Sequence, residues 1–134
     1  MRFLPIFIFF IQITPNFSDY PTDCEEFQKA SELQQNELPQ LENVFQNVEL
    51  QWDRGTNSFA CKYYIVEWGC GTGCQMNAIF DQETGEFLTS LNTTMGCEYR
   101  ANSNLLKVSA DPLHDKPDKY YLFEDGKLKP LKRP

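Results

Sequence analysis

The N-terminal part of the chain repeats its apolar residues at the spacing of a helix. Asp23 has the position of an N-cap residue, with an acid three residues later, and an apolar face continues as far as Leu33. A second series begins near Pro39 and repeats at steps of three and four residues, at Leu41, Val44, Phe45 and Val48. We therefore expect two helices, over residues 23–34 and 39–48.

Beyond a loop at residues 53–57, the period of the pattern changes to two and the segments become rich in aromatic and β-branched residues, which is typical of strands. Five strand-like segments follow, at residues 59–68, 76–81, 86–90, 104–109 and 120–128. The last of these is a hairpin around Asp125-Gly126, a strong turn signal. Two helices followed by about five strands predict an α+β fold, in which the N-terminal helices pack on one face of an antiparallel β-meander.

Residues 3–13 (FLPIFIFFIQI) are almost wholly apolar. A membrane-spanning helix needs about 20 such residues, so the run is too short to cross a bilayer but fits the apolar region of a signal peptide. The small residue Ser18 is a suitable cleavage point. We expect a signal peptide over residues 1–18, a single mature α+β domain over residues 19–134 with no transmembrane segment, and a periplasmic or secreted location.

Negative charge is concentrated near the N-terminus of the expected mature chain. All nineteen acidic residues remain after removal of residues 1–18, against eleven basic ones, so the net charge changes from −7 to −8. Residues 19–53 carry nine acids and one lysine. Binding to nucleic acid requires Lys and Arg to neutralise phosphates, so this composition argues against a nucleic-acid partner. The basic residues at 127–133 could contact an anionic surface or lie on a solvated terminal strand.

The five cysteines, at positions 24, 61, 70, 74 and 97, are expected to form disulfides in an exported protein. At most two internal bonds can form, which leaves one cysteine over. Two glycines between Cys70 and Cys74 permit a sharp turn, because glycine readily adopts positive φ. We expect a Cys70–Cys74 disulfide that staples this turn, then a Cys61–Cys97 disulfide between neighbouring strands, with Cys24 unpaired on the first helix.

Other roles remain open for Cys70 and Cys74. A redox pair usually has the spacing C-x-x-C at the start of a helix, and this pair has the spacing C-x-x-x-C between two strands. A zinc site needs about four ligands, so other cysteines or His114, the only histidine, would have to complete it. A catalytic Cys74 would need His114 as its base, with Asp111 or Asp115 orienting the imidazole ring.

One part of the chain resembles a known group of proteins. The stretch Trp68-Gly-Cys-Gly-Thr-Gly-Cys-Gln75, which follows Phe59-Ala60 and precedes Glu98-Tyr-Arg100, resembles small exported bacterial proteins of unknown function that carry a W-G-C-G-T-x-C-Q motif. The resemblance covers roughly residues 41–128 and implies a bacterial, exported, single-domain protein without implying a mechanism. The chain departs from this pattern at Cys61, where the pattern has glycine.

These features favour a non-enzymatic exported binding or inhibitor-like module, with no cofactor and no metal. Trp68, Thr72 and Gln75 surround the stapled turn and are the predicted recognition residues, and Arg100 is a further candidate for binding. The partner would be an envelope or extracellular protein or a small ligand. The alternative is a small thiol-dependent hydrolase or transferase that uses the cysteine–histidine pair described above.

Overall fold

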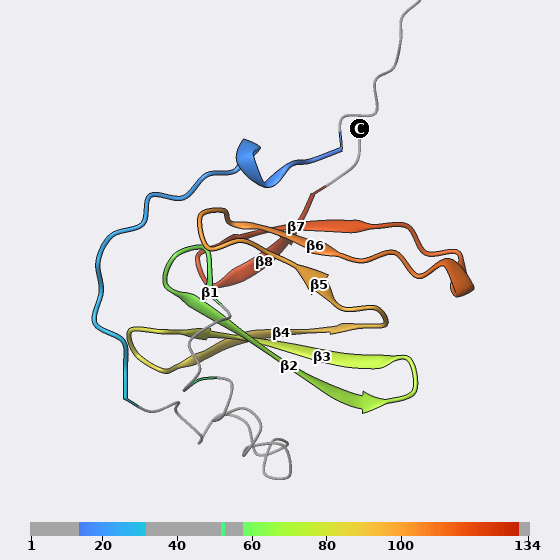
Figure 1. The fold of residues 1–134 in the computed structure, drawn as a ribbon, viewed down its shortest axis with the longest axis horizontal. Coiled ribbons are helices and arrows are strands. Elements are labelled where there is room, and N and C mark those ends of the chain that lie inside the picture. The colour runs from blue at the N-terminus through green and yellow to red at the C-terminus, as the bar shows by residue number, and fades with distance from the viewer. Residues whose placement is uncertain (1–13, 32–51, 53–57, 132–134) are drawn as a thin grey trace, which may run out of the picture.

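A computed structural model describes residues 14–31, Trp52 and residues 58–131 of the chain. Within these residues it contains eight strands and two short 3₁₀ helices. In chain order the elements are η1 (Phe17–Asp19), β1 (Ser58–Phe59), β2 (Tyr63–Gly71), β3 (Cys74–Asp81), β4 (Phe87–Thr93), β5 (Cys97–Glu98), β6 (Leu105–Val108), η4 (Pro112–His114), β7 (Lys119–Glu124) and β8 (Lys127–Pro130). The strands form two antiparallel sheets, with the orders β1-β2-β3-β4 and β5-β6-β7-β8 (Figure 1).

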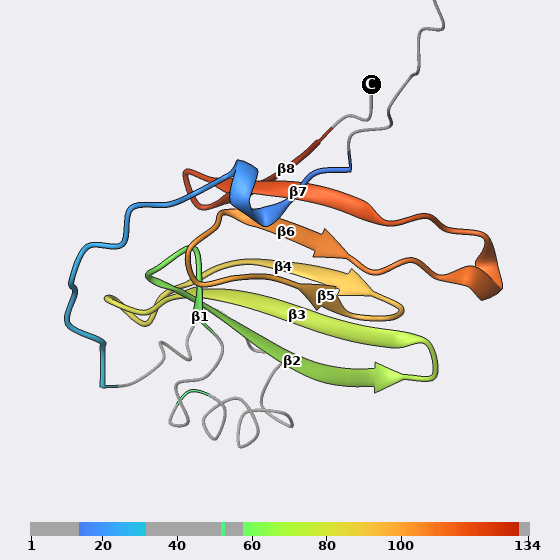
Figure 2. The ribbon, with the colours of Figure 1, turned by 45° about the horizontal axis from the view of Figure 1, so that its top comes forward.

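The two sheets pack face to face through a shared apolar core (Figures 1 and 2). The first sheet contributes Phe59, Ile65 and Ile79 to this core, and all three are buried. The second sheet contributes the buried residues Leu106 and Phe123. Alternate residues of a strand point to opposite faces, so the neighbours of these residues along each strand point away from the core. The molecule therefore has the layers of a β-sandwich.

The first sheet is covered on its outer face as well. Tyr64, Val66, Ala78 and Phe80 form a second buried cluster there with Trp52. Because both faces of β2 are packed over part of its length, its sequence reads Tyr-Tyr-Ile-Val without the polar alternation of a half-exposed strand. Burial of both faces thus explains the continuous apolar run that identifies this strand in the sequence.

The predicted α+β fold with a meander of about five strands is wrong, because the regular secondary structure of the described residues is mostly strand and forms two separate antiparallel sheets. Residues 22–30 have no regular secondary structure, where the apolar spacing predicted a helix. The Thr22 N–H donates to the Asn102 carbonyl oxygen at 3.0 Å. The Ala30 N–H donates to the Gln82 carbonyl oxygen at 2.7 Å. The Ala30 N–H lies inside the predicted helix and would be paired within it, so its bond to a distant turn shows that tertiary contacts outweigh the local helical preference.

Two sequence predictions concern residues outside the described part of the chain. The second predicted helix, over residues 39–48, lies there, and so does the apolar run at residues 3–13. Both therefore stay predictions. The expected cleavage point, Ser18, lies in η1. Among the residues that the structure describes, no helix is long and apolar enough to cross a bilayer.

The loops of the sandwich gather at its two ends (Figure 1). One end carries the β2–β3 turn, the β4–β5 loop at residues 94–96 and the β6–β7 loop at residues 109–118. We call this the stapled end, because the turn contains the Cys70–Cys74 disulfide. The β3–β4 turn and the β5–β6 loop at residues 99–104 lie at the opposite end. The strand order thus brings three segments that are distant in sequence to one place.

Candidate functional site

The turn between β2 and β3 is closed by a disulfide between Cys70 and Cys74, whose Cα atoms lie 5.1 Å apart. Gly71 and Gly73 have φ values of 127° and 66°, in the region that favours glycine. Residues 69–73 are exposed, so the turn projects into solvent. The bond that the cysteine spacing favoured is therefore present, and it closes a tight turn that depends on glycine.

The four predicted recognition residues do not form one surface. Trp68 packs against the outer cluster of the first sheet, whereas Gln75 extends its amide on the inner face of that sheet. Thr72 is exposed at the tip of the turn. Arg100 lies at the other end of the sandwich, where its guanidinium group stacks 4.5 Å from the centre of the Phe17 ring. The stapled turn itself therefore exposes only Thr72 among these four.

The second disulfide joins Cys24 to Cys61, at a sequence separation of 37. The prediction of a Cys61–Cys97 bond is wrong, and Cys97 is the free cysteine. Cys61 follows β1 at the end away from the staple, whereas Cys97 begins β5 beside the stapled end. Cys61 has a φ of 72°, a value that favours glycine, which is the residue of the resemblance pattern at this position. The bond anchors the irregular N-terminal segment to the β1–β2 turn.

Cys97 is partly buried between the sheets and acts as a hydrogen-bond donor. Its Sγ lies 3.3 Å from Asn77 Oδ1 and 3.7 Å from Glu67 Oε1. Burial and the neighbouring Glu67 carboxylate raise the pKa of Cys97 to about 12. The thiol is therefore protonated at neutral pH and lacks the thiolate form that cysteine nucleophiles require.

Glu67 joins the same polar cluster from β2. Burial raises its pKa, and the hydrogen bond from Cys97 opposes that rise. Its second oxygen accepts from Gln75 Nε2 at 3.3 Å. Nearby, Asn77 Nδ2 donates to Thr93 Oγ1 at 3.1 Å, and the same oxygen accepts from a backbone N–H of the β4–β5 loop at 3.1 Å. The cluster therefore ties the inner face of the first sheet to a loop of the stapled end.

The alternative catalytic pair lacks its nucleophile while the disulfide is closed. Cys74 is bonded to Cys70, so its sulfur is not a thiolate that could attack a substrate. His114 Nδ1 lies 2.6 Å from Asp111 Oδ2, and this bond lowers the pKa of the Asp111 carboxyl. Asp111 also accepts from the Leu113 N–H at 3.1 Å, so it caps η4. Within the described ranges, no three His, Cys, Asp or Glu side chains gather as a metal ion would require.

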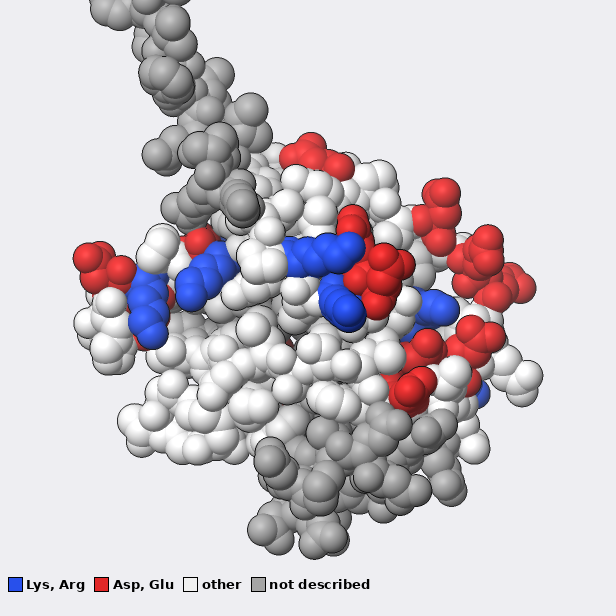
Figure 3. All heavy atoms as spheres, turned by 180° about the vertical axis from the view of Figure 1, so that it is seen from behind, with Lys and Arg blue, Asp and Glu red and all other residues white. Residues whose placement is uncertain are grey.

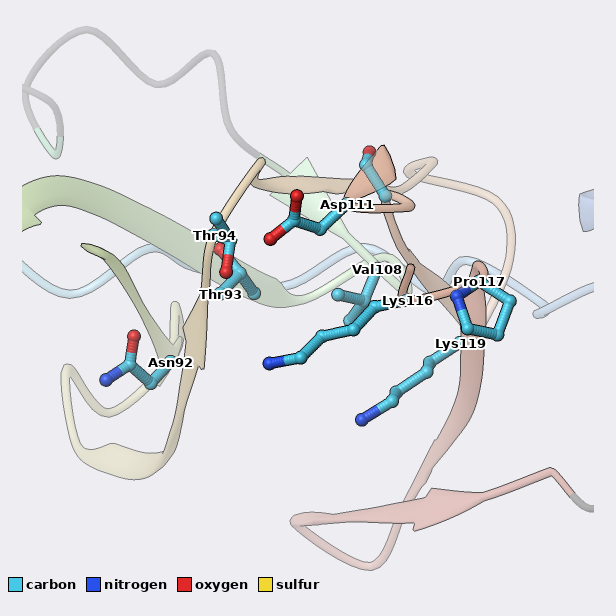
Figure 4. Close-up of a pocket in the computed structure, with 9 residues that line it drawn as sticks. Asn92, Thr93, Thr94, Val108, Asp111, Lys116, Pro117 and Lys119 are labelled. Atoms are coloured by element: carbon cyan, nitrogen blue, oxygen red, sulfur yellow. The ribbon is translucent and has the colours of Figure 1, made fainter. Parts of the chain in front are cut away.

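A pocket of about 290 Å³ opens between the two sheets at the stapled end (Figure 4). The end of β4 and the loop after it form one wall, and β6, β7 and the loop between them form the other. Its charged and hydroxyl side chains are Thr93, Thr94, Ser109, Asp111, Lys116 and Lys119. The two lysine side chains extend in the same direction, and the Asp111 carboxylate is turned toward Thr94 (Figure 4). The lining of the pocket therefore contains two cations and one acid.

The stapled end also carries two exposed apolar side chains, Met95 and Leu113, which the sequence analysis did not identify as functional. Met95 and Leu113 are 56% and 89% exposed, and they are the exposed large apolar side chains of the described part. Met95 lies in the β4–β5 loop and Leu113 lies in η4, so both belong to the stapled end. The sequence feature that could have identified them is the presence of one large apolar residue in each of two otherwise polar loops, at residues 94–96 and 109–118.

Comparisons of the chain with models of protein families, with curated proteins and with solved structures return no match. The class of protein is therefore defined by its structure, an antiparallel β-sandwich with two disulfides. Two disulfides are compatible with a protein exported to an oxidising compartment.

Proposed function

We propose that this chain is an exported binding module that recognises a partner protein through its stapled end. The supporting observation is the position of Met95 and Leu113, whose exposed apolar side chains lie in two loops of that end. Apolar anchors within a polar rim are typical of protein-binding surfaces. The exposed tip at Thr72 and the polar pocket supply such polar groups at the same end.

The loops that carry these anchors are held in place by internal bonds. The Leu113 N–H donates to Asp111 Oδ1, and two backbone hydrogen bonds of 2.9 Å join Asp111 to Lys116. The residue after Met95 donates its N–H to Thr93 Oγ1 at 3.1 Å. A surface that is ordered before binding loses less conformational entropy when a partner docks. This preorganisation favours a recognition role for the stapled end.

Cysteine chemistry also supports a binding role over a thiol enzyme. Cys74 is part of a disulfide, and the protonated thiol of Cys97 lies partly buried between the sheets. Export is supported by the signal-like run at residues 3–13 and by the two disulfides. The partner is accordingly an envelope or extracellular protein.

Capture of the partner from the extracellular and envelope fractions tests this proposal. The exported protein serves as bait, and a retained protein is identified by mass spectrometry, purified and titrated against three forms of the bait. In the variant M95S/L113S the dissociation constant should rise about a hundredfold or more, because each of the two buried apolar anchors contributes about 1.5–3 kcal/mol. The matched control E83S/E86S, on the exposed β3–β4 turn at the opposite end, should bind like the wild type. Equal affinity of M95S/L113S and the wild type would contradict the proposal.

A further inference from the structure

We propose that the pocket of the stapled end binds a single carboxylate group, that of an acidic side chain or of the chain terminus of the partner. This inference rests on the proposed function and adds the chemical group that the partner presents. Three features support it: the positions of Lys116 and Lys119, the hydrogen bonds that occupy both oxygens of Asp111, and the neutral donors in the pocket lining. Figure 3 shows one face of the molecule from behind, where basic side chains cross the middle and acidic side chains lie beside them and toward the edges.

Lys119 enters the pocket from the inner face of the second sheet. It pairs with Val108 in the register of β6 and β7. Its alternate neighbours along β7, Tyr121 and Phe123, pack in the core between the sheets, so the Lys119 side chain leaves the strand on the core side. Because Lys119 is the first residue of β7, its ammonium group lies at the open end of the sandwich rather than in the apolar centre (Figure 4).

Lys116 is held near Lys119 by its backbone. The Lys116 N–H donates to the Asp111 carbonyl oxygen, and the Asp111 N–H donates to the Lys116 carbonyl oxygen, both at 2.9 Å. Pro117 then restricts the backbone that leads into β7. Figure 4 shows both lysine side chains extended in one direction across the pocket. The two charges are thus brought together by the chain itself, before any ligand is present.

Neither ammonium group forms an ion pair with a carboxylate within residues 14–31, 52 and 58–131. By contrast, Lys129 on the same sheet does form an ion pair, because its Nζ lies 3.3 Å from Glu124 Oε2. An anion that enters the pocket would therefore not have to displace a carboxylate of the described residues from Lys116 or Lys119. Charge-assisted hydrogen bonds to such an anion are stronger than those between neutral groups.

Asp111 is the acid of the pocket, and both of its oxygens are already bonded. Oδ2 lies 2.6 Å from Nδ1 of His114, and Oδ1 accepts from the Leu113 N–H at 3.1 Å. The bond with His114 lowers the pKa of Asp111, so this carboxyl is ionised at neutral pH. Two lysines and one aspartate give the pocket a net charge of +1. Such a site matches a monoanionic carboxylate better than a phosphate dianion.

Neutral donors complete the site. Thr94 and Ser109 line the pocket, and each hydroxyl group can donate one hydrogen bond. The volume of about 290 Å³ is at the lower end of ligand pockets and is sufficient for one carboxylate-bearing side chain. The donors and the volume together favour a small anionic group over an extended ligand.

A titration of the exported, disulfide-intact protein with sodium acetate tests the pocket directly. Backbone amide shifts are recorded by ¹H–¹⁵N NMR at pH 7, with sodium chloride used to keep the ionic strength constant. We expect saturable shifts at Thr94, Ser109, Lys116 and Lys119. In K116A/K119A the dissociation constant for acetate should rise about tenfold or more, because two charge-assisted bonds are lost. The control K107A/K129A removes two lysines of the same sheet that pair with acids, and its affinity should equal that of the wild type.

Three outcomes would overturn the inference: no saturable shift with acetate, equal acetate affinity in K116A/K119A, or tighter binding of sodium phosphate than of acetate. The amide spectrum of K116A/K119A without acetate should match that of the wild type outside the pocket, which separates lost binding from lost folding. Acetate titration requires no partner protein. A failure here would therefore leave recognition through Met95 and Leu113 intact, and a failed partner experiment would leave acetate binding intact.

Discussion

Removal of each disulfide should show how differently the two bonds contribute to folding. The variants C24S/C61S and C70S/C74S each replace both partners of one bond, so neither creates a new unpaired thiol. A disulfide stabilises the folded state mainly by restricting the unfolded chain, and this effect grows with the length of the closed loop. The two bonds differ ninefold in that length, with sequence separations of 37 and 4.

These separations give an order of magnitude for each variant. The chain-entropy relation predicts a loss of about 4 kcal/mol for C24S/C61S and about 2 kcal/mol for C70S/C74S at 25 °C. A third variant measures the cost of the backbone conformation at residue 61, where Cys61 has a φ of 72°. In C24S/C61G the glycine adopts this conformation readily, so this variant should be about 1–2 kcal/mol more stable than C24S/C61S.

Urea unfolding, followed by tryptophan fluorescence, measures these differences. Trp52 is 3% exposed in the folded chain, so its emission should shift when the chain unfolds. Hydrogen exchange at Thr22 and Ala30 adds a local measurement, since their N–H groups bond to distant loops and should exchange faster in C24S/C61S. An equal or larger loss of stability in C70S/C74S would refute the reasoning from loop length.

Two further predictions follow from the polar cluster between the sheets. Cys97 should react with a thiol reagent at pH 8 far more slowly in the folded protein than in urea, because burial raises its pKa to about 12; equal rates would contradict this. Burial also raises the pKa of Glu67 above its ordinary value of 4.5, so the folded state retains a proton that the unfolded state releases. The stability that this proton contributes is complete below pH 4.5 and is lost as the pH rises through the folded-state pKa. In E67Q this decline should disappear from urea midpoints measured between pH 4 and 7, whereas the exposed control E83Q should retain it.

The strands of this chain were predictable because their signals are local. The run at residues 63–66 is apolar on both faces, and the segments at 76–81, 86–90 and 104–109 overlap β3, β4 and β6. The C-terminal hairpin turns at Asp125-Gly126, whose φ values of 53° and 72° are those that this dipeptide favours. The two-residue strands β1 and β5 escaped prediction because they are too short to show a period.

The first predicted helix failed for the opposite reason. Its apolar spacing is compatible with a helix, but Cys24 is bonded to Cys61 and Lys29 donates to the Trp52 carbonyl oxygen at 2.6 Å. Such partners lie tens of residues away and are invisible to a local pattern. The same limit explains the cysteines, since the close pair Cys70 and Cys74 was identified and the distant pair was not.

The sequence by itself determined the strand segments, the turn that the glycines allow and the disulfide across that turn, because residues adjacent in the chain decide these features. Only the tertiary structure decided that the strands form two packed sheets and that Trp68 and Gln75 lie on opposite faces. It also decided that Thr94 and Lys119 line one pocket. Such proximity depends on strand order and register, which are set by the burial of apolar faces between the sheets over the whole chain.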